Sequence, residues 1–362
     1  MENYSITLPA WTVGKEALDK ISEICAPYGK SAVLIGGQKA LRAISAKIRR
    51  AVEGKIALTA ELLYGGEASR ENIEALKAER SVQKADMLFA AGGGKALDTV
   101  KALGLEIDKP VFAFPTIAST CAACTAVSIL YHPDGSFAGP CFLKNPPVHT
   151  FICTPVIAEA PKKYLWAGLG DTYAKYFEAE MSARGDALSH YHALGVGASR
   201  MCLEPLLMHA AAALRDQESG RLTDDLTQTI LTVIVNTAIA SILLTADKKI
   251  DYNTGLAHAI FYALTSFAEL AIEKNHLHGE VVGFGVLALL LVDGQKDMFQ
   301  TMLRFNRSVG LPTRLSDIGV PEEALKRVLC QVLKMKDIEH NPYPITLEML
   351  EGAFEELKRV TA

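Results

Sequence analysis

The chain has 362 residues, of which 49% are hydrophobic and 22% charged, and this length is enough for two globular domains with separate cores. A formal net charge of −4 argues against a broad basic surface, so we expect neither a nucleic-acid nor a membrane partner. Its seven cysteines are scattered and no signal peptide opens it, which favours a cytoplasmic protein with reduced thiols. Residues 230–246 are the most apolar stretch, but polar residues interrupt it, so a buried helix is expected there rather than a membrane span.

The first 160 residues alternate apolar strands with helices. Residues 31–37 predict a strand that ends in glycines, and residues 38–52 predict the helix that follows it. A second strand is predicted over 56–63, and Ser69 is a suitable N-cap for a helix that ends at Arg80. This alternation is typical of βαβ units with a parallel sheet, in which ligands gather at the carboxyl ends of the strands.

A run of three glycines, residues 92–94, follows a predicted strand over 86–91 and precedes an amphipathic helix. A helix that begins directly after glycines points unpaired N–H groups and a positive dipole end at one spot, which suits a phosphate, and Lys95 adds a cation. A bare turn fits these residues equally well, because the dinucleotide fingerprint and the Walker motif are both missing. The loops at Gly36 and at residues 115–120 end at the same edge of the predicted sheet, and this convergence favours a nucleotide site.

Strand signals stop near residue 155, after a hairpin marked by Pro133-Asp134-Gly135. From residue 161 onward the sequence predicts long helices over 162–182, 186–215, 223–246, 256–272 and 281–291. The predicted fold class is therefore α/β plus all-α, with a nucleotide-binding α/β domain over 1–160 and a helical domain over 161–362.

Three polar residues stand out in the apolar surroundings of the helical half. Asp171 follows Ala167-Gly168-Leu169-Gly170 at a predicted helix start, His258 lies within residues 255–259, and His278 lies within residues 276–280. Each has a structural alternative, because a carboxylate caps a helix start and a single histidine packs into a core. Their spacing does not join them into a metal site, since the sequence contains no His-x-x-x-His motif.

Four motifs in order resemble those of the iron-containing (group III) alcohol dehydrogenases, in particular the glycerol dehydrogenase branch. They are Gly92-Gly93-Gly94-Lys95-Ala96-Leu97-Asp98, Pro115-Thr116-Ile117-Ala118-Ser119-Thr120, Ala167-Gly168-Leu169-Gly170-Asp171 and His278-Gly279-Glu280. The resemblance covers nearly the whole chain. It implies a Rossmann-like parallel-sheet domain followed by a helical domain (the dehydroquinate synthase-like fold), an active site in the cleft between them, and a homo-oligomer.

The same resemblance makes Asp171, His258 and His278 the catalytic centre and the ligands of one divalent metal. Iron-dependent members of the family usually carry a fourth ligand, a histidine one helical turn after the aspartate, where this chain has Lys175. We therefore expect a three-ligand zinc site with an open position, with iron, manganese or nickel as alternatives. His276 is expected to support the ligands rather than to bind, and Lys175 is either an ordinary helix lysine or a group that helps to hold a substrate carboxylate.

The resemblance also implies contacts with a nicotinamide cofactor. It assigns the pyrophosphate and ribose to Gly93, Gly94, Lys95 and Asp98, the middle of the cofactor to Thr116 and Ser119, and the nicotinamide end to Thr125, Val127 and Tyr131. Relatives that use NAD generally end the first strand with an aspartate, whereas this chain has Gly37 and then Lys39, with Arg42 nearby. A 2′-phosphate would meet no acid there, so NADP is favoured over NAD, although Lys39 is also consistent with a solvated helix lysine.

One departure from the glycerol dehydrogenase pattern concerns the substrate. These enzymes usually carry an aspartate after the Ser-Thr pair of the 115–120 loop, and this chain has Cys121. A neutral thiol accepts hydrogen bonds poorly and does not repel a carboxylate, and the Thr-Cys-Ala-Ala run resembles the hydroxycarboxylate dehydrogenases. We therefore expect a small-molecule substrate, a 2-hydroxy acid/2-oxo acid pair, rather than glycerol.

Other readings of the sequence stay open at this stage. Cys121 and Cys124 also form a Cys-x-x-Cys motif, which is compatible with redox chemistry. At the level of the whole protein, the alternatives are a dehydrogenase of glycerol or of another polyol or alcohol, a lyase like dehydroquinate synthase, and a nucleotide-binding protein without catalytic activity.

Overall fold

The computed structural model describes residues 4–361. The chain packs into two compact units, the first of Met1–Pro161 with Ser219–Ile242 and the second of Lys162–Glu218 with Leu243–Ala362. The sequence analysis places all of 161–362 in one domain, whereas the structure groups Ser219–Ile242 with the first unit. The assignment of Ser219–Ile242 to the first unit depends on contacts between segments that are distant in the chain, and sequence patterns do not reveal such contacts.

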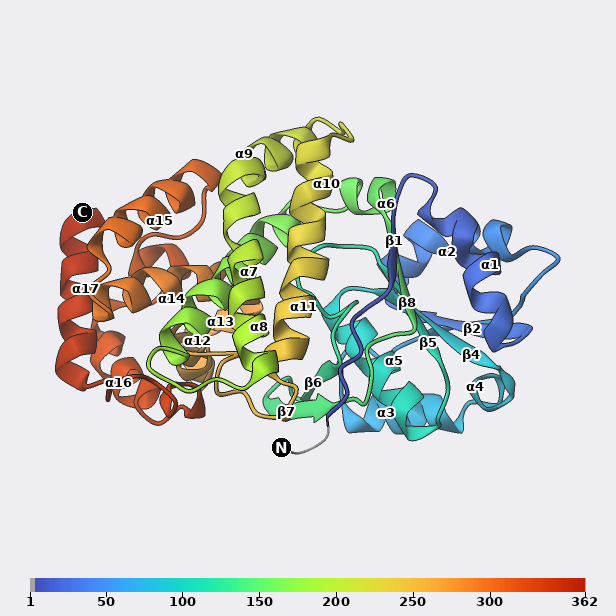
Figure 1. Ribbon diagram of the computed structural model, residues 1–362, viewed down its shortest axis with the longest axis horizontal. Helices are drawn as coiled ribbons and strands as arrows, with labels where there is room; N and C mark the ends of the chain where they lie inside the picture. Colours follow the sequence, from blue (N-terminus) through green and yellow to red (C-terminus); the bar gives the residue numbers. More distant parts are fainter. Residues whose placement is uncertain (1–3, 362) are drawn as a thin grey trace. The chain divides into compact units, whose positions relative to one another are not determined.

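The first unit is built on a six-stranded parallel sheet with the spatial order β1-β8-β5-β4-β2-β3 (Figure 1). Its strands are β1 (Trp11–Gly14), β2 (Ser31–Gly36), β3 (Ala57–Leu63), β4 (Met87–Gly92), β5 (Val111–Pro115) and β8 (His149–Cys153). The predicted parallel sheet is confirmed. The sequence analysis missed β1, because this edge strand is short and not fully buried and depends on its pairing with β8.

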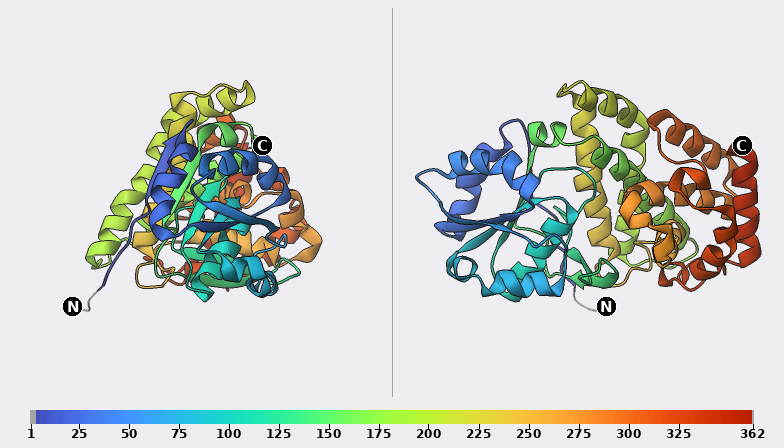
Figure 2. Two further views of the ribbon diagram at one scale, coloured as in Figure 1. Left: turned by 90° about the vertical axis from the view of Figure 1, so that its right-hand side faces the viewer. Right: turned by 180° about the vertical axis from the view of Figure 1, so that it is seen from behind.

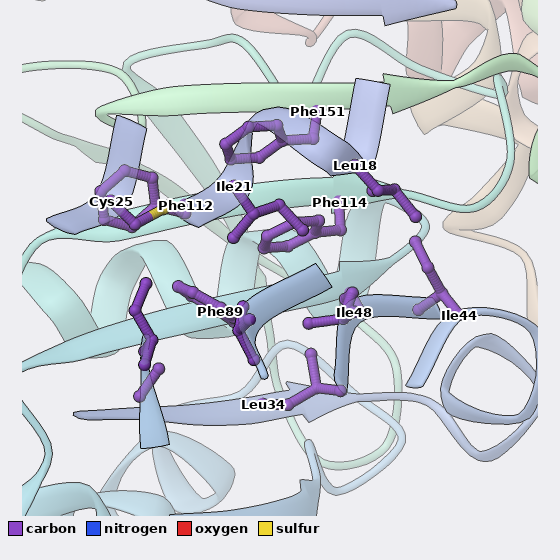
Figure 3. Packing of buried hydrophobic residues seen from close by; sticks show 14 of the residues in the cluster. Leu18, Ile21, Cys25, Leu34, Ile44, Ile48, Phe89, Phe112, Phe114 and Phe151 are labelled. Atoms are coloured by element: carbon purple, nitrogen blue, oxygen red, sulfur yellow. The ribbon is translucent and has the colours of Figure 1, made fainter. Parts of the chain in front are cut away.

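Helices cover both faces of this sheet, as Figures 1 and 2 show. One face carries α1 (Ile21–Cys25) and α2 (Gln38–Val52), and the other carries α3 (Arg70–Ala78), α4 (Arg80–Lys84) and α5 (Gly94–Glu106). On the α1–α2 side, aromatic side chains from neighbouring strands form the core (Figure 3). The ring of Phe114 lies 5.1 Å from that of Phe89 and 5.1 Å from that of Phe151, which are favourable aromatic contacts.

The structure of the first unit agrees closely with the helix bounds, N-cap and hairpin predicted from the sequence. Helix α2 has the predicted bounds, and the Oγ of Ser69 accepts a hydrogen bond of 3.3 Å from the N–H of Asn72, as expected of an N-cap. Helix α3 ends at Ala78, slightly before the predicted end. The predicted hairpin is also present, as the antiparallel strands β6 (Val127–Tyr131) and β7 (Phe137–Phe142), and α6 (Thr154–Ala158) follows β8.

A long apolar helical run contributes to both units. It consists of α10 (Asp224–Leu231), a π-helical turn (Thr232–Asn236) and α11 (Thr237–Leu244). The 21-residue run Asp224–Leu244 is long and apolar enough to cross a membrane, but 72% of its most apolar window is buried inside the structure. A core helix of a globular protein passes the same test of length and composition.

The second unit is helical. Its helices are α7 (Lys163–Ser182), α8 (His190–Ser199), α9 (Glu204–Glu218), α12 (Leu256–Thr265), α13 (Ile272–Asn275), α14 (His278–Val292), α15 (Lys296–Val309), α16 (Glu322–Val332) and α17 (Leu347–Thr361). The helices predicted over 186–215 and 256–272 are each broken. The first break precedes Pro205, a residue suited to a helix start. The second contains Ala271, which has a left-handed φ of 49°, and no glycine or proline marks this break in the sequence.

Candidate metal centre and phosphate site

Helices α7 and α14 touch backbone to backbone because glycines line their contact. A Cβ on Gly170 would lie 2.0 Å from the carbonyl oxygen of Gly279, and a Cβ on Gly279 would lie 2.1 Å from that of Ala167. Only glycine permits so close an approach. Helix α12 meets α14 in the same way, since a Cβ on Gly285 would lie 2.8 Å from the carbonyl oxygen of Ala257.

These helix contacts bring Asp171 of α7, His258 of α12 and His278 of α14 together. One ligand atom from each lies within 4.8 Å of the others. Asp171 lies well inside α7 rather than at its start, so the interpretation of this carboxylate as a helix cap is wrong. The histidines were likewise only candidates from the sequence, because the contacts that join them to Asp171 are tertiary.

The distances from Asp171 to the two histidines suit ligands of one tetrahedral metal ion. The Oδ1 of Asp171 lies 3.5 Å from the Nε2 of His258 and 3.4 Å from the Nε2 of His278. Two ligands bound ~2.0–2.1 Å from one tetrahedral ion are ~3.3–3.4 Å apart, whereas direct hydrogen bonds between such atoms are typically ~2.9 Å long. One carboxylate oxygen and two imidazole nitrogens are also donors that zinc and other divalent transition metals accept.

Glu178 holds His258 in place, and the sequence analysis missed it. Its Oε2 lies 2.6 Å from the Nδ1 of His258, its Oε1 accepts a 2.9 Å hydrogen bond from the His258 backbone N–H, and its side chain is completely buried. A carboxylate on Nδ1 turns the free Nε2 of the ring toward the metal. Glu178 lies two helical turns after Asp171 on the same face of α7, and this i, i+7 spacing of acids in an apolar helix was the available signal.

The electrostatics of the centre favour charged groups despite burial. Burial raises the pKa of the Asp171 carboxyl, but the imidazoles of His258 and His278 outweigh it, so this pKa lies well below its ordinary value. Burial lowers the pKa of His258, but the carboxylates of Glu178 and Asp171 prevail and raise it to about 10. The two carboxylates therefore favour the doubly protonated imidazolium when no metal is bound, and a metal ion would have to displace the proton on Nε2.

His276 has a different role from His278. Its Nδ1 lies 2.9 Å from the Oε1 of Glu280, and the other oxygen of Glu280 accepts a 3.0 Å hydrogen bond from the N–H of Leu277. These contacts organise the start of α14, the helix on which His278 is the first residue. Among the described residues, His276 does not belong to the group of potential ligands, and its support of the ligands stays a prediction.

In the first unit, the predicted phosphate loop lies at a switch point of the sheet. The chain continues from β2 to β3 on one side and from β4 to β5 on the other, and ligands of such sheets bind where the strand order reverses. Gly92 ends β4 with a φ of 151°, and a Cβ on Gly93 would lie 2.5 Å from the Cδ1 of Ile117. Helix α5 begins at Gly94 without a side-chain cap, so no side chain competes with a ligand for the capping position.

The predicted cofactor residues divide into two groups. Close to this edge, the Nζ of Lys95 lies 2.5 Å from the Oε2 of Glu67 and 4.9 Å from the centre of the Tyr131 ring. Gly37 and the exposed Lys39 lie at the start of α2, Thr116 is buried after β5, and Ser119 and Cys121 are partly exposed in the loop beyond it.

Asp98, Thr125 and Val127 instead contact the buried ammonium of Lys101. The Nζ of Lys101 lies 2.9 Å from the Asp98 carboxylate and donates to the Oγ1 of Thr125 at 3.0 Å and to the carbonyl of Val127 at 2.5 Å. The other oxygen of Asp98 accepts a 3.2 Å hydrogen bond from the N–H of Ile129. Burial raises the pKa of Asp98, although Lys101 partly offsets this effect. These contacts hold the base of the β6–β7 hairpin, so a ribose contact of Asp98 stays a prediction.

The cysteines of the Cys-x-x-Cys motif form no disulfide, nor does any other cysteine within residues 4–361. The Sγ of Cys124 lies 3.4 Å from the Oγ1 of Thr150, and burial raises the pKa of this thiol to about 12. A thiol with so high a pKa is a poor nucleophile, which argues against redox chemistry at this motif.

Comparisons with known proteins identify the family. Residues 9–145 match the model of the family described as "Iron-containing alcohol dehydrogenase". A glycerol dehydrogenase of Thermotoga maritima is 36% identical over 298 residues, which are 78% of this chain and 77% of that protein. The chain belongs to the iron-containing alcohol dehydrogenase family. The resemblance seen in the sequence motifs is thereby confirmed, and the protein is an oxidoreductase that acts on CH–OH groups, as its relatives are.

Other members of the iron-containing alcohol dehydrogenase family match over a larger part of the chain. Hydroxycarboxylate dehydrogenase A of Escherichia coli is 28% identical and aligns with 91% of this chain and 90% of its own length. The crystal structure of a probable glycerol dehydrogenase from Sinorhizobium meliloti 1021 superposes with a TM-score of 0.83 and 26% identity, covering 99% of both chains. The predicted combination of a parallel-sheet domain and a helical domain is therefore confirmed as a family fold.

Replacing Glu178 with glutamine tests its control over the His258 ring. We expect Glu178→Gln to lower the affinity for zinc by about 10- to 100-fold, because the neutral amide no longer fixes the charge and the tautomer of the ring. Competition with a chelator of known affinity measures this effect. Glu180→Gln, on the same helix but without a bond to His258, is the matched control. Equal zinc affinities in the two variants would refute the assignment.

Proposed function

We propose that the protein is a metal-dependent oxidoreductase that transfers hydride between NADP(H) or NAD(H) and a small 2-hydroxy acid/2-oxo acid pair. The group Asp171, His258 and His278 carries the proposal, because it gathers three donor atoms within 4.8 Å of one another, and Asp171 lies from each histidine at a distance that suits ligands of one ion, in a chain of the iron-containing alcohol dehydrogenase family. Zinc is proposed first, since three protein ligands leave one position open for substrate, with iron, manganese and nickel as alternatives.

Each residue of the centre has a defined task in this proposal. Asp171, His258 and His278 hold the ion, and Glu178 keeps the proton of His258 on Nδ1, so that Nε2 is available as a ligand. A bound divalent ion supplies the Lewis acidity that lowers the pKa of a substrate hydroxyl, and a bound nicotinamide accepts or donates the hydride. The side chains of His258 and Glu178 are 6% and 0% exposed, so the protein limits the access of water to this part of the centre.

The cofactor is assigned to the switch point of the sheet in the first unit. There the glycine turn at residues 92–94 and the first turn of α5 offer backbone N–H groups to the pyrophosphate, and Lys95 adds a positive charge. Lys39 is exposed at the start of α2, and no acidic residue stands in the first turn of that helix. NADP is therefore proposed ahead of NAD, and a Michaelis constant for NADH far below that for NADPH would contradict this order.

The choice of a 2-oxo acid as substrate rests on Cys121. The carboxylate that glycerol dehydrogenases usually place after the Ser-Thr pair is replaced by a neutral thiol, which removes a repulsion of several kcal/mol against an anionic substrate. The likeness to hydroxycarboxylate dehydrogenase A over 91% of the chain supports the same choice. Glycerol is the second candidate substrate, because the Thermotoga maritima glycerol dehydrogenase is the more identical relative, at 36%.

The substrate assignment predicts the behaviour of a charge variant. With zinc-loaded protein, we expect 2-oxobutyrate to be reduced with a kcat/KM at least ~100-fold above that for reduction of dihydroxyacetone, the oxidised form of glycerol. Cys121→Asp should lower the value for 2-oxobutyrate by ~100-fold, whereas the neutral control Cys121→Ser should stay within about tenfold of the parent enzyme. Efficient oxidation of glycerol by an enzyme that ignores 2-oxo acids would overturn the assignment in favour of the second candidate.

A further inference from the structure

Helix α7 buries a lysine ammonium that has no anionic partner. Lys175 lies one helical turn after Asp171 and is 6% exposed. Its Nζ donates to the carbonyl oxygen of Asn253 and, at 2.9 Å, to the Oδ1 of the same residue. No carboxylate within residues 4–361 forms an ion pair with it, because the two acids nearest to it in position on α7, Asp171 and Glu178, face imidazoles instead.

A buried cation without an anion is expensive for a folded protein. Desolvation of an ammonium costs far more than two bonds to neutral oxygens return, and buried charges are therefore normally paired. An ammonium also has three N–H donors, and the side chain of Lys175 uses two of them in the described structure. One donor and the whole positive charge are thus available to a ligand.

The position of Lys175 relates this charge to the metal centre. Residues four apart on a helix have Cβ atoms ~5–6 Å from each other, so Lys175 and Asp171 occupy neighbouring positions on one face of α7. Its partner Asn253 lies just ahead of Gly255, the N-cap of the helix that carries His258. The ammonium therefore lies beside the segments that supply two of the three potential ligands.

We infer that Lys175 binds the carboxylate of the substrate and selects 2-oxo acids over neutral carbonyl compounds. The inference rests on the proposed function, since the carboxylate of a 2-oxo acid is bonded directly to the reacting carbonyl carbon. An anion site for such a substrate must lie close to the metal ligands, and Lys175 is the buried cation that α7 places there. The carboxylate supplies the missing counter-charge and accepts a charge-assisted hydrogen bond.

The test is Lys175→Gln, which retains an N–H donor for Asn253 but removes the charge. With zinc-loaded protein, we expect its kcat/KM for 2-oxobutyrate to fall by ~10- to 100-fold more than its kcat/KM for glycolaldehyde, a neutral carbonyl compound, with most of the loss in KM. Binding of oxamate, an unreactive analogue of a 2-oxo acid, should weaken by at least tenfold in calorimetric titrations in the presence of cofactor. Lys163→Gln, which removes an exposed lysine of the same helix, is the control, and its kcat/KM should stay unchanged for both substrates.

The possible failures are distinguishable. If Lys175→Gln loses the same factor with 2-oxobutyrate and with glycolaldehyde, and oxamate binds unchanged, Lys175 only supports the loop at Asn253, and the inference is overturned while the proposed function stands. If the unmodified enzyme reduces glycolaldehyde but neither reduces 2-oxo acids nor binds oxamate, the substrate assignment fails and the inference fails with it.

Discussion

Replacing His278 with alanine should remove the metal ion and lower turnover by at least ~1000-fold while leaving the helical fold intact. Two protein ligands in place of three hold a divalent ion weakly, and the remaining pair no longer defines a tetrahedral position. The fold should persist, because the His278 side chain is 32% exposed and contributes little to the core. Metal content after dialysis, circular dichroism and the turnover number measure the three parts of this prediction.

His276→Ala is the matched control for this experiment. His276 lies two residues away and contacts Glu280 rather than Asp171, so its loss weakens the start of α14 without removing a potential ligand. We expect this variant to retain its metal and most of its activity. A His278→Ala protein that keeps stoichiometric metal, or a His276→Ala protein that loses it, would show that the ligand set is misassigned.

Replacing Gly279 with alanine should destabilise the protein by about 3 kcal/mol or more and weaken metal binding at the same time. The new Cβ would lie 2.1 Å from the carbonyl oxygen of Ala167 and 3.0 Å from the Cβ of Asp171. Because the first of these atoms belongs to the backbone of α7, no side-chain rotation relieves the clash, and the two helices must move apart. That movement also separates Asp171 from His278.

Denaturant unfolding of the metal-free protein isolates the packing effect, and a zinc titration of the folded variant measures the effect on the centre. Gly352→Ala is the control, because Gly352 lies within α17 and a Cβ there meets nothing within 4 Å. This substitution should stabilise the protein by ~0.4–1 kcal/mol, since alanine loses less backbone entropy than glycine in a helix. If Gly279→Ala unfolded at the same denaturant concentration as the parent protein, the glycine contact would not be what holds α7 against α14.

Features of this protein that depend on neighbouring residues in the chain followed from the sequence. The bounds of α2, the N-cap at Ser69 and the glycine turn after β4 are examples, because periodicity, capping and backbone freedom act over a few residues. The break near Ala271 escaped the same reasoning, since a left-handed alanine carries no sequence signal. Family motifs pointed to Asp171, His258 and His278, but the spacing of these residues did not.

The sequence by itself thus determined the strands other than β1, most of the helices and the candidate ligands Asp171, His258 and His278, but not Glu178. Only the tertiary structure decided which of those residues meet. Glycine contacts between α7, α12 and α14 bring one ligand atom each of Asp171, His258 and His278 within 4.8 Å of the others. The carboxylate of Glu178 contacts His258, and that of Asp98 pairs with Lys101. The physical reason is that the role of a side chain depends on the groups that it contacts. Helix packing determines those contacts, and the periodicity of the sequence does not specify how the helices pack.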